Sequence, residues 1–182
     1  MTVASSKSPA PAIFLDRDGT IMRDVDYCGD PNDVELLPGV PNALRKLRES
    51  GYKLIVITNQ SGIARGYFTE KQYRAVETEV SRQIGTSLID ATYFCPHLPD
   101  DGCKCRKPSS EMILNAACDH DVDLARSFFI GDKRSDLECG RNAGVRTILV
   151  RTGYGKNLDG NLADFVTQDL SEAAEIILHA RP

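Results

Sequence analysis

The chain has 182 residues, which is enough for one domain with a full hydrophobic core. Its 22 basic and 26 acidic residues give a formal net charge of -4, without a long run of lysine or arginine. This charge argues against a general electrostatic grip on nucleic acid or an anionic membrane, and it favours a small diffusible ligand. The first residues, MTVASSKSPAP, lack the apolar segment of a signal peptide, and no apolar run is long enough to span a membrane. We therefore predict a cytoplasmic monomer with no membrane or nucleic-acid partner.

Short apolar runs alternate with amphipathic stretches along the chain, a pattern typical of an α/β protein with a mainly parallel sheet flanked by helices. The predicted elements, in chain order, are a strand at 12–15, a helix at 40–50, a strand at 53–57, a helix that starts at Thr69, a strand at 92–94, a helix opened by Ser109 or Ser110, a strand at 127–130, a helix opened by Ser135, a strand at 147–150 and a helix opened by Ser171. No repeat or linker divides the chain, so we expect a flexible tail at 1–10 and a single domain at 11–182.

One helix start is supported by two signals. Thr69 and Gln72 stand three residues apart, the spacing of a capping box. The apolar residues that follow recur at helical spacing and predict a face that packs on the core: Tyr73, Val76, Val80 and Ile84.

Residues suited to chemistry stand where the predicted strands end. Asp16 follows the first strand, Thr58 the second, Cys95 closes the third, and Asp132 follows the fourth. Because the carboxyl ends of parallel strands border one crevice, these residues are expected to converge.

The stretch 16-DRDGT-20 holds two carboxylates two residues apart, followed by a glycine that permits a sharp turn. Carboxylate and main-chain oxygens suit Mg²⁺, and Asp132 would add a further carboxylate. The alternative is a plain surface turn, because Asp, Gly and Thr are common turn residues. The other strand-end residues make that alternative less favourable.

No other catalytic machinery is present in the sequence. It contains no GxSxG elbow, no P-loop and no GxGxxG after a strand, and only three histidines. The acid/base must then be a carboxylate, for which Asp18 is the candidate. Asp16 would attack phosphorus and form an aspartyl-phosphate that water hydrolyses.

Four short motifs, in order and at strand ends, resemble those of the haloacid dehalogenase superfamily phosphatases: Asp16-x-Asp18-Gly19-Thr20, Thr58-Asn59, Lys107 and Gly131-Asp132. The resemblance implies a Rossmann-like sheet and catalytic Mg²⁺. It implies that Asp16 is nucleophile and Mg²⁺ ligand, and that Asp18 is general acid/base and lends its main-chain carbonyl to the metal. Asp132 would be the remaining Mg²⁺ ligand, while Thr58 and Lys107 would hold the phosphoryl oxygens.

Longer stretches resemble the family of D-glycero-D-manno-heptose 1,7-bisphosphate 7-phosphatases, a branch that includes the histidinol-phosphate phosphatases. They are 58-TNQSGIARGYFT-69, CPH at 95–97, CKCRKP at 103–108, GDK at 131–133 and VRTG at 150–153. The resemblance implies removal of the 7-phosphate from the heptose bisphosphate, in the synthesis of ADP- or GDP-heptose precursors. With no separate cap domain, substrate contacts would come from loop residues: Asp24, Val25, Asp26, Tyr27, Asn59, Gln60, Ser61, Arg106 and Lys133.

The same branch carries a zinc loop, and the spacing Cys95-x-His97-x5-Cys103-x-Cys105 provides four ligands, enough to close a tetrahedral Zn²⁺ site. A closed site is structural. The alternative of ordinary buried thiols is weak, because the segment is too polar to bury unaided. We expect zinc to hold the loop while Arg106 and Lys107 bind anions. The remaining cysteines are expected to be free thiols: Cys28, Cys118 and Cys139.

The sequence departs from the heptose enzymes at three places. Met22 stands where they usually carry Asn, Asp26-Tyr27-Cys28 stands for Gly-Tyr-Val, and the zinc loop is shorter, as in the histidinol-phosphate branch. A histidinol-phosphate phosphatase, or another phosphatase of small sugar phosphates, is therefore the alternative. A non-enzymatic zinc-clip binding protein is opposed by the acidic charge and the lack of a basic or aromatic stripe.

Overall fold

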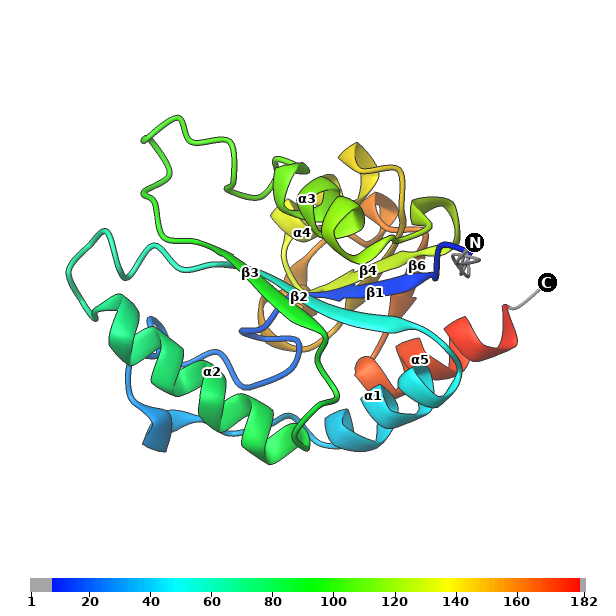
Figure 1. The fold of residues 1–182 in the computed structure, drawn as a ribbon, viewed down its shortest axis with the longest axis horizontal. Helices are drawn as coiled ribbons and strands as arrows, with labels where there is room; N and C mark the ends of the chain where they lie inside the picture. The colour runs from blue at the N-terminus through cyan, green and yellow to red at the C-terminus, as the bar shows by residue number, and fades with distance from the viewer. Residues whose placement is uncertain (1–7, 181–182) are drawn as a thin grey trace, which may run out of the picture.

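A six-stranded parallel sheet runs through the middle of the computed structural model, which describes residues 8–180 (Figure 1). The strand order is β3-β2-β1-β4-β5-β6. The strands are β1 (Ala12–Leu15), β2 (Lys53–Asn59), β3 (Ala91–Cys95), β4 (Phe128–Gly131), β5 (Arg146–Val150) and β6 (Phe165–Thr167). The central strands β1 and β4 read AIFL and FFIG and are buried throughout, as expected for parallel strands covered on both faces. The predicted Rossmann-like α/β fold is confirmed.

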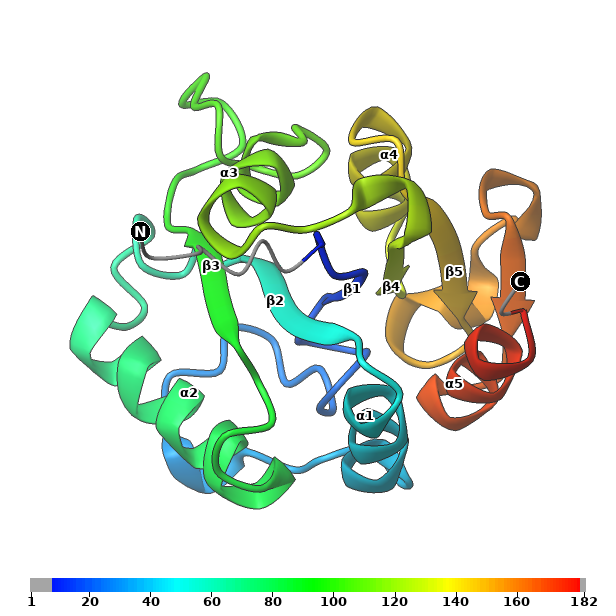
Figure 2. The ribbon, with the colours of Figure 1, turned by 45° about the vertical axis from the view of Figure 1, so that its right-hand side comes forward.

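Helices cover both faces of this sheet. In Figures 1 and 2, α1, α2 and α5 lie on one face, and α3 and α4 lie on the other. Their bounds are α1 (Val40–Glu49), α2 (Glu70–Ile84), α3 (Glu111–His120), α4 (Arg134–Asn142) and α5 (Leu170–His179). Each face has its own apolar cluster of buried side chains, so the sheet separates two cores. Four 3-10 turns complete the described elements: η1 (Pro31–Asp33), η2 (Leu124–Arg126), η3 (Gly153–Asn157) and η4 (Gly160–Leu162).

The predicted start of α2 is confirmed in both of its parts. The Thr69 hydroxyl accepts from the Gln72 main-chain N–H at 3.3 Å, and the Gln72 side-chain oxygen accepts from the Thr69 N–H at 2.9 Å. The apolar stripe that follows is buried at all four positions: Tyr73, Val76, Val80 and Ile84.

Two other predicted helix starts are wrong. The N-cap of α4 is Lys133, with Asp136 bonding back to the Lys133 N–H, so Ser135 lies inside the helix. The N-cap of α5 is Asp169, whose carboxylate accepts from the Glu172 N–H at 2.9 Å, so Ser171 also lies inside. In α5 the Asp169 carboxylate is the N-cap acceptor, and in α4 the Asp136 carboxylate accepts from the N-cap N–H, so both helices begin before the predicted serines. The short strand β6 was not predicted.

The strand order reverses between β1 and β4, and this reversal places a crevice outside the carboxyl ends of these two strands. Between β1 and β3 the described chain contains only η1, α1 and α2 besides β2, in agreement with the predicted lack of a cap domain. Of the tail predicted at 1–10, residues 1–7 lie outside the described residues, while the Ala10 N–H donates to the Asp121 carbonyl at 3.1 Å. Among residues 8–180, none of the helices has the length and apolar character needed to cross a membrane.

The corrected cap of α5 gives a stability prediction. We expect Asp169→Ala to lower the free energy of unfolding by about 1 kcal/mol, because the Glu172 N–H loses its acceptor. Ser171→Ala is the matched control and should change this free energy by less than about 0.5 kcal/mol. Urea denaturation followed by circular dichroism measures both. A larger loss for Ser171→Ala than for Asp169→Ala would contradict the assignment.

Candidate active site and metal sites

Two buried carboxylates stand at the point where the strand order reverses. Asp16 directly follows β1 and Asp132 directly follows β4, and the Asp16 N–H donates to the Ile130 carbonyl at 3.0 Å. Asp136, on the first turn of α4, joins them, and the carboxylate oxygens of the three residues lie within 4.8 Å of one another. The fold therefore gathers three acidic groups from β1, β4 and α4 in one buried place.

Lys107 is the cation at the centre of this group. Its buried ammonium lies 2.7 Å from Asp16 Oδ1, 2.7 Å from Asp136 Oδ1 and 2.8 Å from the Ile57 carbonyl oxygen. The main chain of Lys107 is clamped by Asn59, which accepts from the Lys107 N–H at 3.0 Å and donates to its carbonyl at 3.2 Å. The end of β2 thus fixes the lysine that neutralises the residue at the end of β1.

Two lysines, Lys107 and Lys133, act on the three carboxylates. Burial acts to raise the pKa of Asp16, but the charges of Lys107 and Lys133 and the Lys107 hydrogen bond hold it below the ordinary value. Burial and the charges of Asp16 and Asp136 raise the pKa of Asp132 to about 8. Burial and the Asp16 charge raise the pKa of Asp136 to about 6, against the effect of Lys107. Burial and mutual repulsion thus disfavour ionisation of Asp132 and Asp136.

A divalent cation fits this arrangement. Asp132 Oδ1 is buried and has no hydrogen-bond partner, so one hard oxygen ligand is left available. Octahedral Mg²⁺ with Mg–O distances of about 2.0–2.1 Å places its ligand oxygens about 3 to 4 Å apart, within the spread of the three carboxylates. The cation would also stabilise the ionised forms of Asp132 and Asp136, whose pKa values burial and neighbouring carboxylates raise.

Close packing holds the Asp132 carboxylate in place. Its Oδ2 accepts from the Tyr154 N–H at 2.7 Å. A Cβ atom at Gly19 would lie 2.3 Å from Asp132 Oδ2, and one at Gly153 would lie 2.1 Å from the same atom. Both glycines have positive φ, and the Thr152 hydroxyl donates to the Gly19 carbonyl at 2.6 Å. The glycine of the DGT motif is therefore needed for space as well as for the turn.

Asp18 lies beside the three-carboxylate group in a different network. Its carboxylate accepts from Arg17 Nη2 at 3.0 Å and from Gln60 Nε2 at 2.8 Å, and the same Gln60 nitrogen donates to the Thr58 hydroxyl at 2.9 Å. Arg17 is a buried guanidinium whose carbon Cζ lies 5.4 Å from the centre of the Tyr73 ring. These contacts join the ends of β1 and β2 and orient Asp18 while its side chain stays partly exposed, at 16%.

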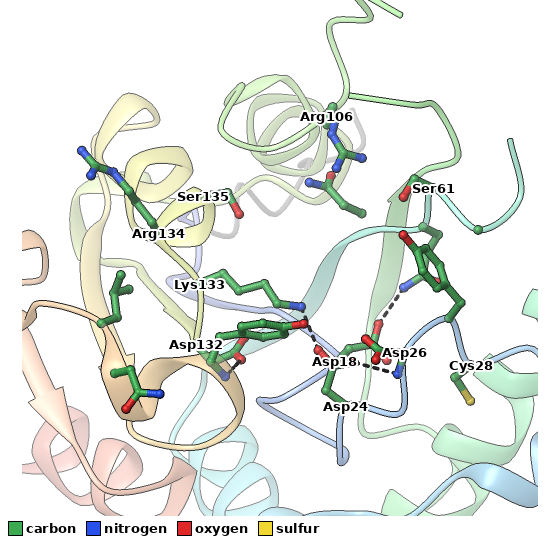
Figure 3. A pocket seen from close by; sticks show the side chains of 17 residues that line it. Asp18, Asp24, Asp26, Cys28, Ser61, Arg106, Asp132, Lys133, Arg134 and Ser135 are labelled. Atoms are coloured by element: carbon green, nitrogen blue, oxygen red, sulfur yellow. Dashed lines mark hydrogen bonds and ion pairs between the residues drawn. The ribbon is translucent and has the colours of Figure 1, made fainter. Parts of the chain in front are cut away.

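A cleft of about 530 Å³ opens above these residues (Figure 3). It is lined by most of the predicted site residues: Asp18, Asp24, Asp26, Tyr27, Asn59, Gln60, Ser61, Arg106, Asp132 and Lys133. Asp16, Thr58 and Lys107 are buried and absent from the lining, and Val25 packs against the core cluster beneath α1 and α2. In Figure 3, Lys133 reaches across the cleft toward Asp24, and the two side chains form an ion pair at 3.1 Å.

Sequence reasoning missed several residues of this region. The further lining residues are Cys28, Gly62, Arg134, Ser135, Tyr154, Asn157 and Leu158, and the buried pair Arg17 and Asp136 supports the site from beneath. Asp136 reaches the site because it lies on the first turn of α4, where its carboxylate accepts from the Lys133 N–H one residue after Asp132. Tyr154 and Asn157 had no signal in the sequence, since only the turn after β5 brings them to the cleft.

The predicted zinc ligands form a compact cluster on the loop after β3. Cys103 Sγ lies 3.6 Å from both Cys95 Sγ and Cys105 Sγ, and His97 Nδ1 lies 3.2 Å from Cys105 Sγ. In a tetrahedral zinc site the sulfurs are about 3.8 Å apart, and a sulfur and a nitrogen are about 3.5 Å apart. The four ligands therefore fit zinc. Arg106 is tied to this loop, because its Nη1 donates to the His97 carbonyl at 3.2 Å.

Two family models match the chain: haloacid dehalogenase-like hydrolase at residues 13–98, and HAD-hydrolase-like at residues 104–173. With the fold and the strand-end carboxylates, these matches define a haloacid dehalogenase-like hydrolase.

Sequence relatives and a solved structure identify the family within this class of hydrolases. D-glycero-D-manno-heptose-1,7-bisphosphate 7-phosphatase from Thermosynechococcus vestitus is 39% identical, over 96% of this chain and 99% of the relative. The D-glycero-beta-D-manno-heptose-1,7-bisphosphate 7-phosphatase of Helicobacter pylori J99 is 44% identical, over 78% and 83%. The crystal structure of D,D-heptose 1,7-bisphosphate phosphatase from B. bronchiseptica, complexed with magnesium and phosphate, has a TM-score of 0.86 and 36% identity, over 94% of this chain and 99% of that one. The chain belongs to the family of D-glycero-D-manno-heptose-1,7-bisphosphate 7-phosphatases, which confirms the resemblance found in its motifs.

The contact between Gly153 and Asp132 can be tested with a matched pair of variants. Gly153→Ala and Gly51→Ala both place a side chain at positive φ, at a cost of about 1–2 kcal/mol each, but nothing lies within 4 Å of a Cβ at Gly51. We expect Gly51→Ala to lose only the stability due to its backbone conformation, and Gly153→Ala to lose more, because its Cβ would overlap Asp132 and the Gly19 backbone. Only Gly153→Ala should displace Asp132 and weaken Mg²⁺ binding, measured by isothermal titration calorimetry. Unchanged Mg²⁺ affinity in Gly153→Ala would show that Asp132 is not a ligand.

Proposed function

We propose that this protein removes the 7-phosphate of D-glycero-D-manno-heptose 1,7-bisphosphate, through an aspartyl-phosphate on Asp16. The observation that carries the proposal is the buried Asp16 carboxylate, held 2.7 Å from Lys107 at the base of a cleft. The family to which the chain belongs supports the substrate. The position of Asp16 directly after β1, with its carboxylate against Lys107, supports the mechanism. The reaction would serve the synthesis of ADP- or GDP-heptose precursors.

In this mechanism Asp16 attacks phosphorus while Asp18 gives a proton to the departing sugar oxygen. The new bond joins Asp16 to phosphorus, and the bond between phosphorus and the sugar oxygen breaks. Asp18, now a carboxylate, accepts a proton from the water that hydrolyses the aspartyl-phosphate. Lys107 keeps Asp16 ionised for attack, and with Thr58 it would stabilise the phosphoryl oxygens.

Asp16, Asp132 and the main-chain carbonyl of Asp18 would hold Mg²⁺. When bound, Mg²⁺ neutralises the negative charge of the carboxylates and of the phosphate that approaches them. We assign Asp136 to a different task. One of its oxygens lies against Lys107 and the other accepts from the Lys133 N–H, so it positions the lysine of the site.

Zinc, on this proposal, has a structural task on the loop after β3. Its four ligands leave no open position for water or substrate, and the loop carries Arg106 to the cleft. We expect one tightly bound zinc per chain in the purified protein, measured by elemental analysis. Protein that is fully active and free of zinc would contradict this role.

A phosphate-release assay over several esters tests the proposed substrate. The heptose 1,7-bisphosphate should be hydrolysed with far higher kcat/KM than histidinol phosphate. The short zinc loop makes histidinol phosphate the sharpest competitor, because that loop is the feature shared with the other branch. Preference for histidinol phosphate would overturn the substrate and leave the reaction type intact.

Substitution of Arg106 tests whether this residue binds the phosphate that is not cleaved in a bisphosphate substrate. Its neighbour Lys107 contacts Asp16, while Arg106 lines the cleft, so its guanidinium is placed for a different anion. We expect Arg106→Ala to lower kcat/KM for the heptose bisphosphate by an amount equal to about 2–4 kcal/mol of transition-state stabilisation. The same variant should lower kcat/KM for an aryl phosphate much less. Lys104→Ala, an exposed cation on the same loop and absent from the lining, is the control.

If Arg106→Ala lowers kcat/KM equally for both esters, Arg106 acts on the reacting phosphate or supports the fold of the loop. Measuring zinc content in the same preparations separates these two, because only a damaged loop loses the metal.

A further inference from the structure

Tyr154 is an exposed aromatic residue at the wall of the cleft. Its side chain is 59% exposed, although it belongs to the turn η3 that packs against the catalytic centre. Among the described tyrosines, Tyr27 is the other exposed one that lines this cleft. Tyr27 already has partners, because the Tyr67 ring lies 4.8 Å away and the guanidinium of Arg65 lies 5.8 Å from its centre. Exposure of a single ring is ordinary, but Tyr154 lines the cleft and is therefore placed to contact a ligand bound there.

The backbone beneath this ring is fixed from several sides. The Tyr154 N–H donates to Asp132, and the neighbouring Thr152 hydroxyl donates to the Gly19 carbonyl. Arg151 Nη1 donates to the Gly155 carbonyl at 2.8 Å, and a Cβ at Gly155 would lie 1.9 Å from the Val150 carbonyl oxygen. The turn is therefore preorganised, and it presents the Tyr154 ring one residue away from the sharp turn at Gly153.

The Tyr154 ring also lies close to Lys133, one of the cationic residues that line the cleft. Lys133 Nζ lies 4.9 Å from the centre of the Tyr154 ring, within the range of a cation–π contact, and is paired with Asp24 on the other side. Tyr154 therefore contacts Lys133 through its ring and Asp132 through its main-chain N–H. On the proposed function, the reacting phosphate lies beside these two residues. The substrate atoms within reach of the ring are then the carbons that join this phosphate to the rest of the molecule.

We propose that Tyr154 is a specificity-determining residue, whose ring packs against the hydroxylated carbon chain of a sugar phosphate beside the phosphate that is cleaved. The inference rests on the proposed phosphatase function and deepens it. The apolar face of the ring suits the C–H groups of a sugar chain. Lys133 keeps its ion pair with Asp24 whether or not the ring is present.

The two tasks of Tyr154 can be separated by mutation. The bond to Asp132 uses the main-chain N–H, which Tyr154→Ala retains, so this variant removes the ring alone. We expect kcat/KM for the heptose bisphosphate to fall on the order of tenfold, mainly through KM, as for the loss of one aromatic contact. Acetyl phosphate, which has no hydroxylated chain, should be hydrolysed within about twofold of the parent rate. Tyr154→Phe keeps the ring and should keep most of the activity on both.

Leu114→Ala is the control for loss of an exposed apolar side chain, because Leu114 is 44% exposed on α3 and absent from the cleft lining. The proposal would be overturned if Tyr154→Ala lowered kcat/KM similarly for both esters, or did not lower it for the sugar ester. The parent protein tests the proposed substrate independently. If it hydrolyses acetyl phosphate but not the heptose bisphosphate, the same comparison is made with the sugar phosphate that it hydrolyses best, and a selective loss is still expected.

Discussion

The buried ion cluster around Lys107 is the interaction on which the rest of the site depends. Taking charges out of water costs several kcal/mol per ion, and a buried pair is tolerated only when its geometry is close and its remaining polar atoms have partners. Lys107 meets this condition with Asp16, Asp136 and a main-chain carbonyl. Asp132 does not, because one of its buried oxygens has no partner. This oxygen is the atom of the cluster that is available to a further cation.

The sheet topology brings four distant segments together at this cluster. Asp16 comes from the end of β1, Asp132 from the end of β4, Asp136 from α4, and Lys107 from the segment that follows the cysteine loop. The Asn59 side chain at the end of β2 clamps that segment through two hydrogen bonds. The cysteine loop leads directly into this segment, in which Lys107 contacts Asp16 and its neighbour Arg106 lines the cleft, so we propose that the two cations serve different anions.

Much of this site could be predicted from the sequence because its residues stand in short motifs directly after apolar strands. Asp16, Thr58 and Asp132 are examples, and the capping box at Thr69 is equally local. Other features depend on packing that a sequence does not display. Tyr154 reaches the cleft only because the turn after β5 folds back on Gly19. The first residues of α4 and α5 depend on which of several nearby polar side chains binds the free main-chain N–H groups. The strand β6 has three residues, too few for a clear apolar pattern.

The central claim is that Asp16 becomes phosphorylated during turnover. The direct measurement is mass spectrometry of the protein after rapid acid quenching in the steady state, with peptides mapped by proteolysis. The account predicts one added phosphoryl group on the peptide that contains Asp16, and its absence from a folded Asp16→Asn variant that has lost turnover. An Asp16→Asn variant that hydrolyses the heptose bisphosphate at near the parent rate, or a phosphoryl group found on another residue, would contradict it.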